Sequence, residues 1–67
     1  MITLSINGVS RQFPAAIKVG ELIEALGYTG KRIALERNGE IVPRSAFATQ
    51  PLFDGDKLEV VVAVGGG

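Results

Sequence analysis

The fold of this chain is indicated most clearly by residues 2–13, which read ITLSINGVSRQF. Apolar and polar side chains alternate through residues 2–6, which is typical of a β-strand with one buried face. The dipeptide Asn7-Gly8 then predicts a two-residue hairpin loop, because a type I′ turn needs a positive φ at both central positions. With that loop, Ile2 faces Phe13, so the second strand places apolar side chains on the same side as the first. The chain therefore opens with an amphipathic β-hairpin.

A short amphipathic helix is predicted next. The apolar positions that recur at helical spacing are Val19, Leu22, Ile23 and Leu26. Gly27 follows the last of them, where a glycine commonly ends a helix. Lys18 occupies the N-cap position, where Ser, Thr or Asp is preferred, and Glu21 partly compensates by placing negative charge in the first turn. The helix is too short to form without tertiary packing.

A second hairpin follows the helix. Residues 33–37 and 40–42 have strand character, and Asn38-Gly39 between them repeats the hairpin signal. Pro43 cannot donate a hydrogen bond to a neighbouring strand, so the shorter strand lies at an edge or ends there. The order hairpin, helix, hairpin and final strand predicts an α+β fold, with a mixed sheet of about five strands and one helix on one face.

The last strand, residues 58–64, is apolar on both of its faces, which is typical of a central strand. One short helix covers only one face of a sheet. Either the irregular segment 45–53 folds over the second face, or Val61 and Ala63 form an exposed apolar patch of the kind that marks partner sites. A third reading is that both are isolated surface residues without a partner. Phe53, which precedes the turn into this strand, is expected in the core.

The composition argues against several classes of function. The 67 residues include no Cys and no His, which removes disulfides, the usual zinc ligands and the commonest nucleophile–base pairs. We therefore expect no catalytic side chain and no metal. Seven basic and seven acidic residues give zero net charge, without the basic excess that a nucleic acid would require. No apolar run approaches the ~20 residues of a membrane span and no signal peptide is evident, so a cytoplasmic protein is expected.

The sequence ends in Val64-Gly65-Gly66-Gly67. A glycine tail after a strand has no side chains, adopts conformations closed to other residues, and adds ~10 Å of reach when extended. Such a tail suits a chain end that enters a narrow tunnel in another protein and presents its α-carboxylate there. A frayed terminus is the alternative that composition leaves open. We expect residues 1–64 to form the folded domain and residues 65–67 a flexible tail.

In combination, these features resemble the ubiquitin-like β-grasp sulfur carriers, and among them the ThiS family of thiamine biosynthesis. The stretches that carry the resemblance are residues 6–8, 19–27, 38–44, 54–56 and 64–67. The most family-specific of them is 38–44, NGEIVPR, whereas the terminal Gly-Gly is shared with ubiquitin and with the small subunit of molybdopterin synthase. Lys18 departs from the family pattern, which usually has Thr before the helix.

The resemblance implies that the protein is a substrate of its partners and not an enzyme. A carboxylate is ionised at neutral pH, with a pKa of about 3.5, and is a poor electrophile. In the family, an adenylyltransferase (ThiF-like) consumes ATP to activate the terminal glycine, here Gly67. Sulfur from a cysteine persulfide displaces AMP, and the resulting thiocarboxylate supplies a thiazole synthase (ThiG-like). Gly65, Gly66 and Gly67 are then expected to enter the partner's active site, and no cofactor is expected to be bound by the chain itself.

Partner contacts are expected near the last strand. The candidates are Val61 and Ala63, with Phe47 and Leu52 as possible neighbours and Arg44 as a charge at the rim. Two alternatives stay open at this point. One is a carrier with the same chemistry in molybdopterin synthesis or tRNA thiolation, and the other is a ubiquitin-like modifier or binding module that never carries sulfur.

Overall fold

The structure is a computed structural model that describes residues 1–63. The expected end of the last strand at Val64 and the tail Gly65, Gly66 and Gly67 lie outside the described residues. The elements are β1 (Ile2–Ile6), β2 (Val9–Phe13), α1 (Val19–Ala25), β3 (Ile33–Arg37), β4 (Glu40–Val42), a 3₁₀ helix (Arg44–Ala46) and β5 (Lys57–Val62). Apart from the 3₁₀ helix, which the sequence analysis did not predict, this is the order predicted from the sequence. Within residues 1–63, no helix has the length and hydropathy needed to cross a membrane.

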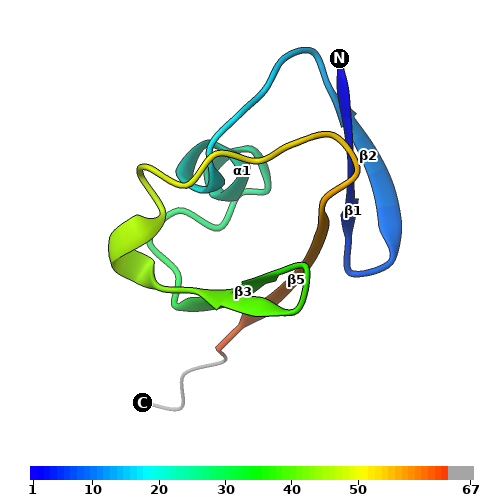
Figure 1. Ribbon diagram of the computed structural model, residues 1–67. Helices are drawn as coiled ribbons and strands as arrows, with labels where there is room; N and C mark the ends of the chain where they lie inside the picture. Colours follow the sequence, from blue (N-terminus) through cyan, green and yellow to red (C-terminus); the bar gives the residue numbers. More distant parts are fainter. Residues whose placement is uncertain (64–67) are drawn as a thin grey trace.

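The five strands form one mixed sheet in the order β2-β1-β5-β3-β4 (Figure 1). β5 lies at its centre, as its apolar sequence predicted, parallel to β1 on one side and antiparallel to β3 on the other. The first hairpin has the predicted register, with Ile2 opposite Phe13. β4 is an edge strand, which agrees with the proline that follows it.

Both hairpin loops are type I′ turns. The φ angles are +52° at Asn7 and +82° at Gly8, and +51° at Asn38 and +86° at Gly39. Asn tolerates this left-handed region better than most residues, and Gly adopts it freely. The right-handed twist of such turns matches that of the paired strands, so two dipeptides determine the register of four strands.

The core lies between one face of the sheet and α1. The side chains that are almost completely buried there are Leu4, Val19, Leu22, Leu35, Leu52 and Leu58. Figure 1 shows α1 on one side of the sheet, with the yellow segment around residue 50 passing close to it. The helix and this segment therefore share one side of the sheet.

The helix ends as the sequence predicted. Gly27 has a φ of +78°, and its N–H donates to the Glu24 carbonyl at 3.1 Å. The Tyr28 N–H donates to the Ile23 carbonyl at 3.0 Å, which completes a Schellman motif.

The start of the helix is satisfied from a distant part of the chain. A lysine ammonium only donates hydrogen bonds, so the Lys18 side chain cannot accept one from the first turn. Instead, the Val19 N–H donates to the Gln50 carbonyl at 2.9 Å, and the Gly20 N–H donates to the Phe47 carbonyl at 2.8 Å. The Lys18 N–H in turn donates to Glu21 Oε1 at 2.8 Å. The poor N-cap in the sequence is therefore compensated by backbone carbonyls of the segment that follows the 3₁₀ helix.

For this segment, one of the alternatives left open by the sequence and one expectation are wrong. Residues 45–53 do not cover the second face of the sheet, because they pack beside α1 on the first. Phe53 is not in the core but 54% exposed. Neighbouring side chains in an extended segment point in opposite directions, and Leu52 takes the inward position. The Phe53 ring lies instead beside the Arg37 guanidinium, whose central carbon is 5.5 Å from the ring centroid.

Candidate partner-binding face

Among residues 1–63, no helix or loop covers the face of the sheet opposite α1, and we call it the outer face. Strand register places alternate residues of each strand on it. These residues are Thr3, Ser5, Ser10, Gln12, Ala34, Glu36, Ile41, Lys57, Glu59 and Val61. Polar side chains occupy β1, β2 and the start of β5, whereas apolar side chains gather around the end of β5. The outer face is therefore divided into a polar region and an apolar region.

The apolar region, which we call the apolar corner, consists of Ala34, Ile41, Val61 and Ala63. Val61 is 63% exposed and pairs with Ala34 on β3, which is also exposed. Ile41 is 76% exposed and lies diagonally across from Ala34 on β4. The exposed Ala63 continues the pairing beyond β5, since its N–H donates to the Arg32 carbonyl at 2.9 Å. A contiguous set of exposed apolar side chains on a sheet face is typical of a protein-binding surface.

Two carboxylates border the apolar corner. Glu36 on β3 and Glu59 on β5 lie directly opposite each other, and both are exposed. Like charges at such a cross-strand position are unfavourable for the isolated sheet. The arrangement is electrostatically complementary to a partner that carries a basic group beside an apolar centre.

The predicted contact residues divide between the two sides of the sheet. Val61 and Ala63 lie on the outer face, which confirms the exposed apolar patch. Leu52 is fully buried and cannot contact a partner, so that expectation is wrong. Phe47 is half-buried against the core on the helix side, away from Val61, because its carbonyl accepts the Gly20 N–H.

Arg44 is exposed and begins the 3₁₀ helix after β4, and its place at a rim stays a prediction. Ala34 and Ile41 were missed from the sequence. The alternation of residues 33–37 and the register across Asn38-Gly39 contain the signal that would have found them.

A buried carboxylate, that of Asp56, lies directly before the first residue of β5. Asp56 is 6% exposed; its Oδ2 accepts from Arg37 Nε at 2.7 Å and from the Phe53 N–H at 2.9 Å. Its Oδ1 accepts from Asn38 Nδ2 at 3.1 Å. Burial by itself raises the pKa of this carboxyl, but the hydrogen bonds from Phe53, Arg37 and Asn38 and the Arg37 charge together lower the pKa below its usual value. Asp56 therefore joins the second hairpin to the turn before β5.

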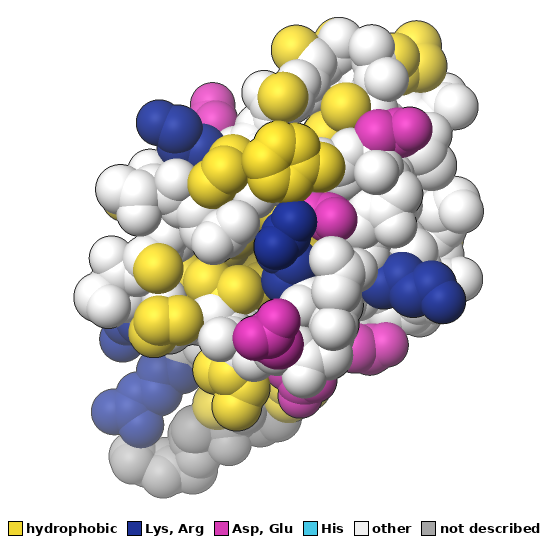
Figure 2. All heavy atoms as spheres, viewed as in Figure 1, with side chains coloured by type: hydrophobic (Ala, Val, Ile, Leu, Met, Phe, Trp, Pro, Cys, Tyr) yellow, Lys and Arg dark blue, Asp and Glu magenta, His cyan; other side chains and the backbone are white. Residues whose placement is uncertain are grey.

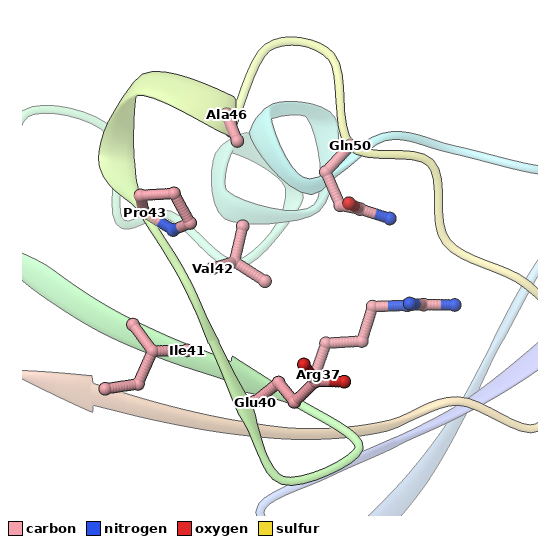
Figure 3. A pocket seen from close by; sticks show the side chains of 7 residues that line it. All are labelled: Arg37, Glu40, Ile41, Val42, Pro43, Ala46 and Gln50. Atoms are coloured by element: carbon pink, nitrogen blue, oxygen red, sulfur yellow. The ribbon is translucent and has the colours of Figure 1, made fainter.

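A shallow hollow lies between the second hairpin and the segment after it (Figure 3). Its lining residues are Arg37, Glu40, Ile41, Val42, Pro43, Ala46 and Gln50. Figure 3 shows Val42 pointing toward the helix and Ile41 pointing away from it. The volume is about 170 Å³, below the ~300 Å³ of typical ligand pockets. The Arg37 charge is already paired with Asp56, so the hollow has the character of a surface depression rather than a small-molecule site.

Charged side chains do not define a site on the side of the molecule that is displayed. Figure 2 shows acidic and basic side chains interspersed with apolar ones over this side, without a continuous block of one sign. Among residues 1–63, no group of three or more Cys, Asp, Glu or His side chains is placed to hold a metal ion. The exposed Asp54 carboxylate has a structural contact instead, because its Oδ1 accepts the Thr3 N–H at 2.7 Å. The strongest candidate site in the described residues is therefore the apolar corner of the outer face.

Comparison with known proteins gives consistent results. A family model described as the ThiS family matches residues 4–67. The chain is 48% identical over 64 residues to a thiazole synthase of Paramagnetospirillum magneticum, a match that covers 96% of this chain and 20% of that protein. It is 36% identical over 66 residues to the uncharacterized protein ycf40 of Pyropia yezoensis, covering 98% of this chain and 93% of that one.

A solved structure matches over its whole length. The crystal structure of a thiamine biosynthesis protein (ThiS) from Geobacter metallireducens has a TM-score of 0.83 and 32% identity, covering 98% of this chain and 100% of that one. This match confirms the expected ubiquitin-like β-grasp fold. The chain spans about a fifth of the length of the thiazole synthase that it matches, 20%.

Proposed function

The chain belongs to the ThiS family, and from this premise we propose that it is a sulfur carrier that supplies the thiazole ring of thiamine. The observation that carries the proposal is the family match over residues 4–67, which includes both the fold and the terminal glycines. In this proposal the protein is a substrate of its partners, not an enzyme. The absence of Cys and His from the sequence is in keeping with chemistry that takes place on the backbone terminus.

The reactive group in the proposal is the α-carboxylate of Gly67. A carboxylate oxygen attacks the α-phosphorus of ATP on an adenylyltransferase (ThiF-like), and pyrophosphate leaves. The terminal sulfur of a cysteine persulfide then attacks the acyl carbon, and AMP leaves. A second thiol reduces the sulfur–sulfur bond and releases the Gly67 thiocarboxylate. ATP is thus consumed by the partner, and the carrier itself holds no cofactor.

Glycine at the last positions fits this chemistry. An acyl carbon must be reached by a nucleotide and then by a persulfide, and the absence of Cβ at Gly66 and Gly67 leaves it open on every side. Gly65 would serve as a spacer between the sheet and the reacting end. No other residue type provides the same slender, unbranched approach into an enclosed site.

The proposed acceptor of the sulfur is a thiazole synthase (ThiG-like). Its support is the 48% identity over 64 residues to part of a larger protein named thiazole synthase. We propose that docking uses the apolar corner around Val61 and Ala63, with Arg44 at the rim. Burial of exposed apolar side chains would supply the affinity, and the Glu36–Glu59 pair would favour a basic group on the partner.

Intact mass spectrometry tests the proposed chemistry. The protein is incubated with ATP, a ThiF-like adenylyltransferase, a persulfide donor and a thiol reductant. The expected product has one sulfur in place of one oxygen, and deletion of Gly67 abolishes it. Failure of the wild-type chain to form this product would refute the sulfur-carrier function.

Two other outcomes would support the alternative functions, a ubiquitin-like modifier or a sulfur carrier of another pathway. Attachment of the chain to lysine side chains of other proteins would identify a ubiquitin-like modifier. Co-purification with a molybdopterin-synthase subunit, and not with a thiazole synthase, would move the same chemistry to another pathway.

A further inference from the structure

The side chain of Asn7 is bonded to β5 as if it were part of a strand. Its Oδ1 accepts the Val60 N–H at 2.7 Å, and its Nδ2 donates to the Val60 carbonyl at 3.0 Å. The Asn7 backbone N–H donates to the Leu58 carbonyl at 2.9 Å. A side-chain amide has the same donor and acceptor as a peptide group, and here it binds both polar groups of one residue.

This contact continues a strand pairing that the backbone does not complete. β1 and β5 pair only through Ser5 with Lys57 and Ile6 with Leu58, because the chain turns away after Ile6. The Asn7 amide occupies the position that the next residue of β1 would have taken. Val60 is therefore supported on both sides, by Asn7 on one and by Leu35 of β3 on the other.

Beyond Val60, the described residues of β5 have a pairing partner on one side only. Val61 and Val62 pair with β3, and the Ala63 N–H donates to the Arg32 carbonyl. No pairing with β1 extends past Leu58. Val60, which the Asn7 side chain binds, is thus the last residue of β5 with a described neighbour on both sides, and it lies four positions before residue 64.

We propose that Asn7 is a positioning residue for sulfur transfer, an inference that rests on the proposed function. Its hydrogen bonds fix the position of Val60, beyond which β5 pairs with β3 alone. We infer that they thereby limit the directions from which the following residues reach a partner's active site. Reaction rates depend steeply on such placement, since an error of about 1 Å can cost ~100-fold. Docking through the apolar corner does not require this contact, because β3 still holds Val61.

Asn38 provides a matched control in the other hairpin. It occupies the same position of the same turn type, with a φ of +51° against +52° at Asn7. Its Oδ1 accepts the Lys57 N–H at 2.9 Å, so it holds the beginning of β5 instead of the end. Glycine adopts a positive φ without strain, so Asn7→Gly and Asn38→Gly keep both turns and remove only the side-chain contacts.

The test combines hydrogen exchange with adenylation kinetics at a temperature where both variants remain folded. In Asn7→Gly, the rate of amide exchange at Val60 is expected to rise by a factor at least ten times that at Leu4, a fully buried strand residue chosen as the reference for global unfolding. With a ThiF-like adenylyltransferase and ATP, kcat for pyrophosphate release is expected to fall about tenfold with KM unchanged. Asn38→Gly is expected to keep the wild-type kcat although it also loses stability.

A second variant is Asn7→Asp. It keeps the acceptor for the Val60 N–H but turns a carboxylate oxygen toward the Val60 carbonyl oxygen, which repels it, so kcat is expected to fall as in Asn7→Gly. An equal loss of kcat in Asn7→Gly and Asn38→Gly, or a change in KM alone, would overturn the inference, because either result would indicate a general effect on folding or docking. A wild-type chain that is not adenylated refutes the proposed function itself and this inference with it.

Discussion

Replacement of Asp56 by Asn tests how much the buried carboxylate contributes to the free energy of unfolding. The substitution keeps the size of the side chain, removes its charge, and puts an amide NH₂ where one acceptor oxygen had been. The one remaining oxygen cannot serve all three donors that the carboxylate now binds, which are the Arg37 guanidinium at 2.7 Å, the Phe53 N–H at 2.9 Å and the Asn38 amide at 3.1 Å. An Arg37 side chain that is 26% exposed can turn partly to water, but the Phe53 N–H cannot follow it.

The magnitude follows from these contacts. A hydrogen bond to a charged group contributes about 1.5–3 kcal/mol, and removal of one partner of a fully buried pair costs about 3–5 kcal/mol. Because Arg37 is partly solvated, we expect a loss of about 2–3 kcal/mol in the free energy of unfolding. A single core of this size supplies only about 3–5 kcal/mol in total. The variant is therefore expected to melt roughly 10–20 °C below the wild type.

The pH dependence gives a second readout. The pKa of Asp56 is lower in the folded state than in the unfolded chain, where an aspartate has its ordinary pKa of 3.8. Its contribution to stability is therefore complete above the unfolded pKa and is lost as the pH falls through the folded pKa. The difference in unfolding free energy between wild type and Asp56→Asn should be largest near neutral pH and should shrink below about pH 4.

The assay is urea and thermal unfolding followed by far-UV circular dichroism at several pH values. The matched control is Asp54→Asn in the same turn, because Asp54 is exposed and asparagine keeps an acceptor for the Thr3 N–H. We expect that control to lie within about 0.5 kcal/mol of the wild type. If Asp56→Asn proved as stable as the control at pH 7, or if the difference between them did not decrease in acid, the reasoning would be refuted.

Three further predictions concern the helix, the core and the outer face. Gly20→Ala should lower the unfolding free energy by about 1 kcal/mol instead of raising it, because a Cβ would lie 3.3 Å from the Phe47 carbonyl oxygen that caps the helix; urea titration decides the sign. Leu22→Ala removes a fully buried side chain and should cost about 2–5 kcal/mol, which leaves much of the population unfolded at 25 °C by circular dichroism. Val61→Ser should change stability by less than about 1 kcal/mol yet weaken binding to a thiazole synthase at least fivefold by calorimetry, whereas Ser10→Ala on the polar region should do neither.

Much of the fold was predictable because its signals are local. Asn-Gly dipeptides between alternating strand residues strongly favour positive φ angles, so both hairpins and their registers follow from a few adjacent residues. Gly27 ends the helix by the same kind of local geometry. The central position of β5 was predictable from its apolar character on both faces, although Val61 and Ala63 are exposed.

The errors concern residues whose surroundings are assembled from distant parts of the chain. Phe53 and Leu52 are adjacent apolar residues, and composition alone does not say which one points inward. The segment that contains them packs beside the helix because its carbonyls at Phe47 and Gln50 accept the first N–H groups of the helix. That choice leaves the second face of the sheet uncovered and exposes the apolar corner.

The sequence by itself determined the two hairpins and the end of the helix, since each depends on backbone conformations that neighbouring residues impose. Only the tertiary structure decided how the helix begins, which face of the sheet stays open, and how Asn7 supports Val60. These features depend on hydrogen bonds between groups 27 to 53 positions apart, and such pairings form only when the chain has closed on itself.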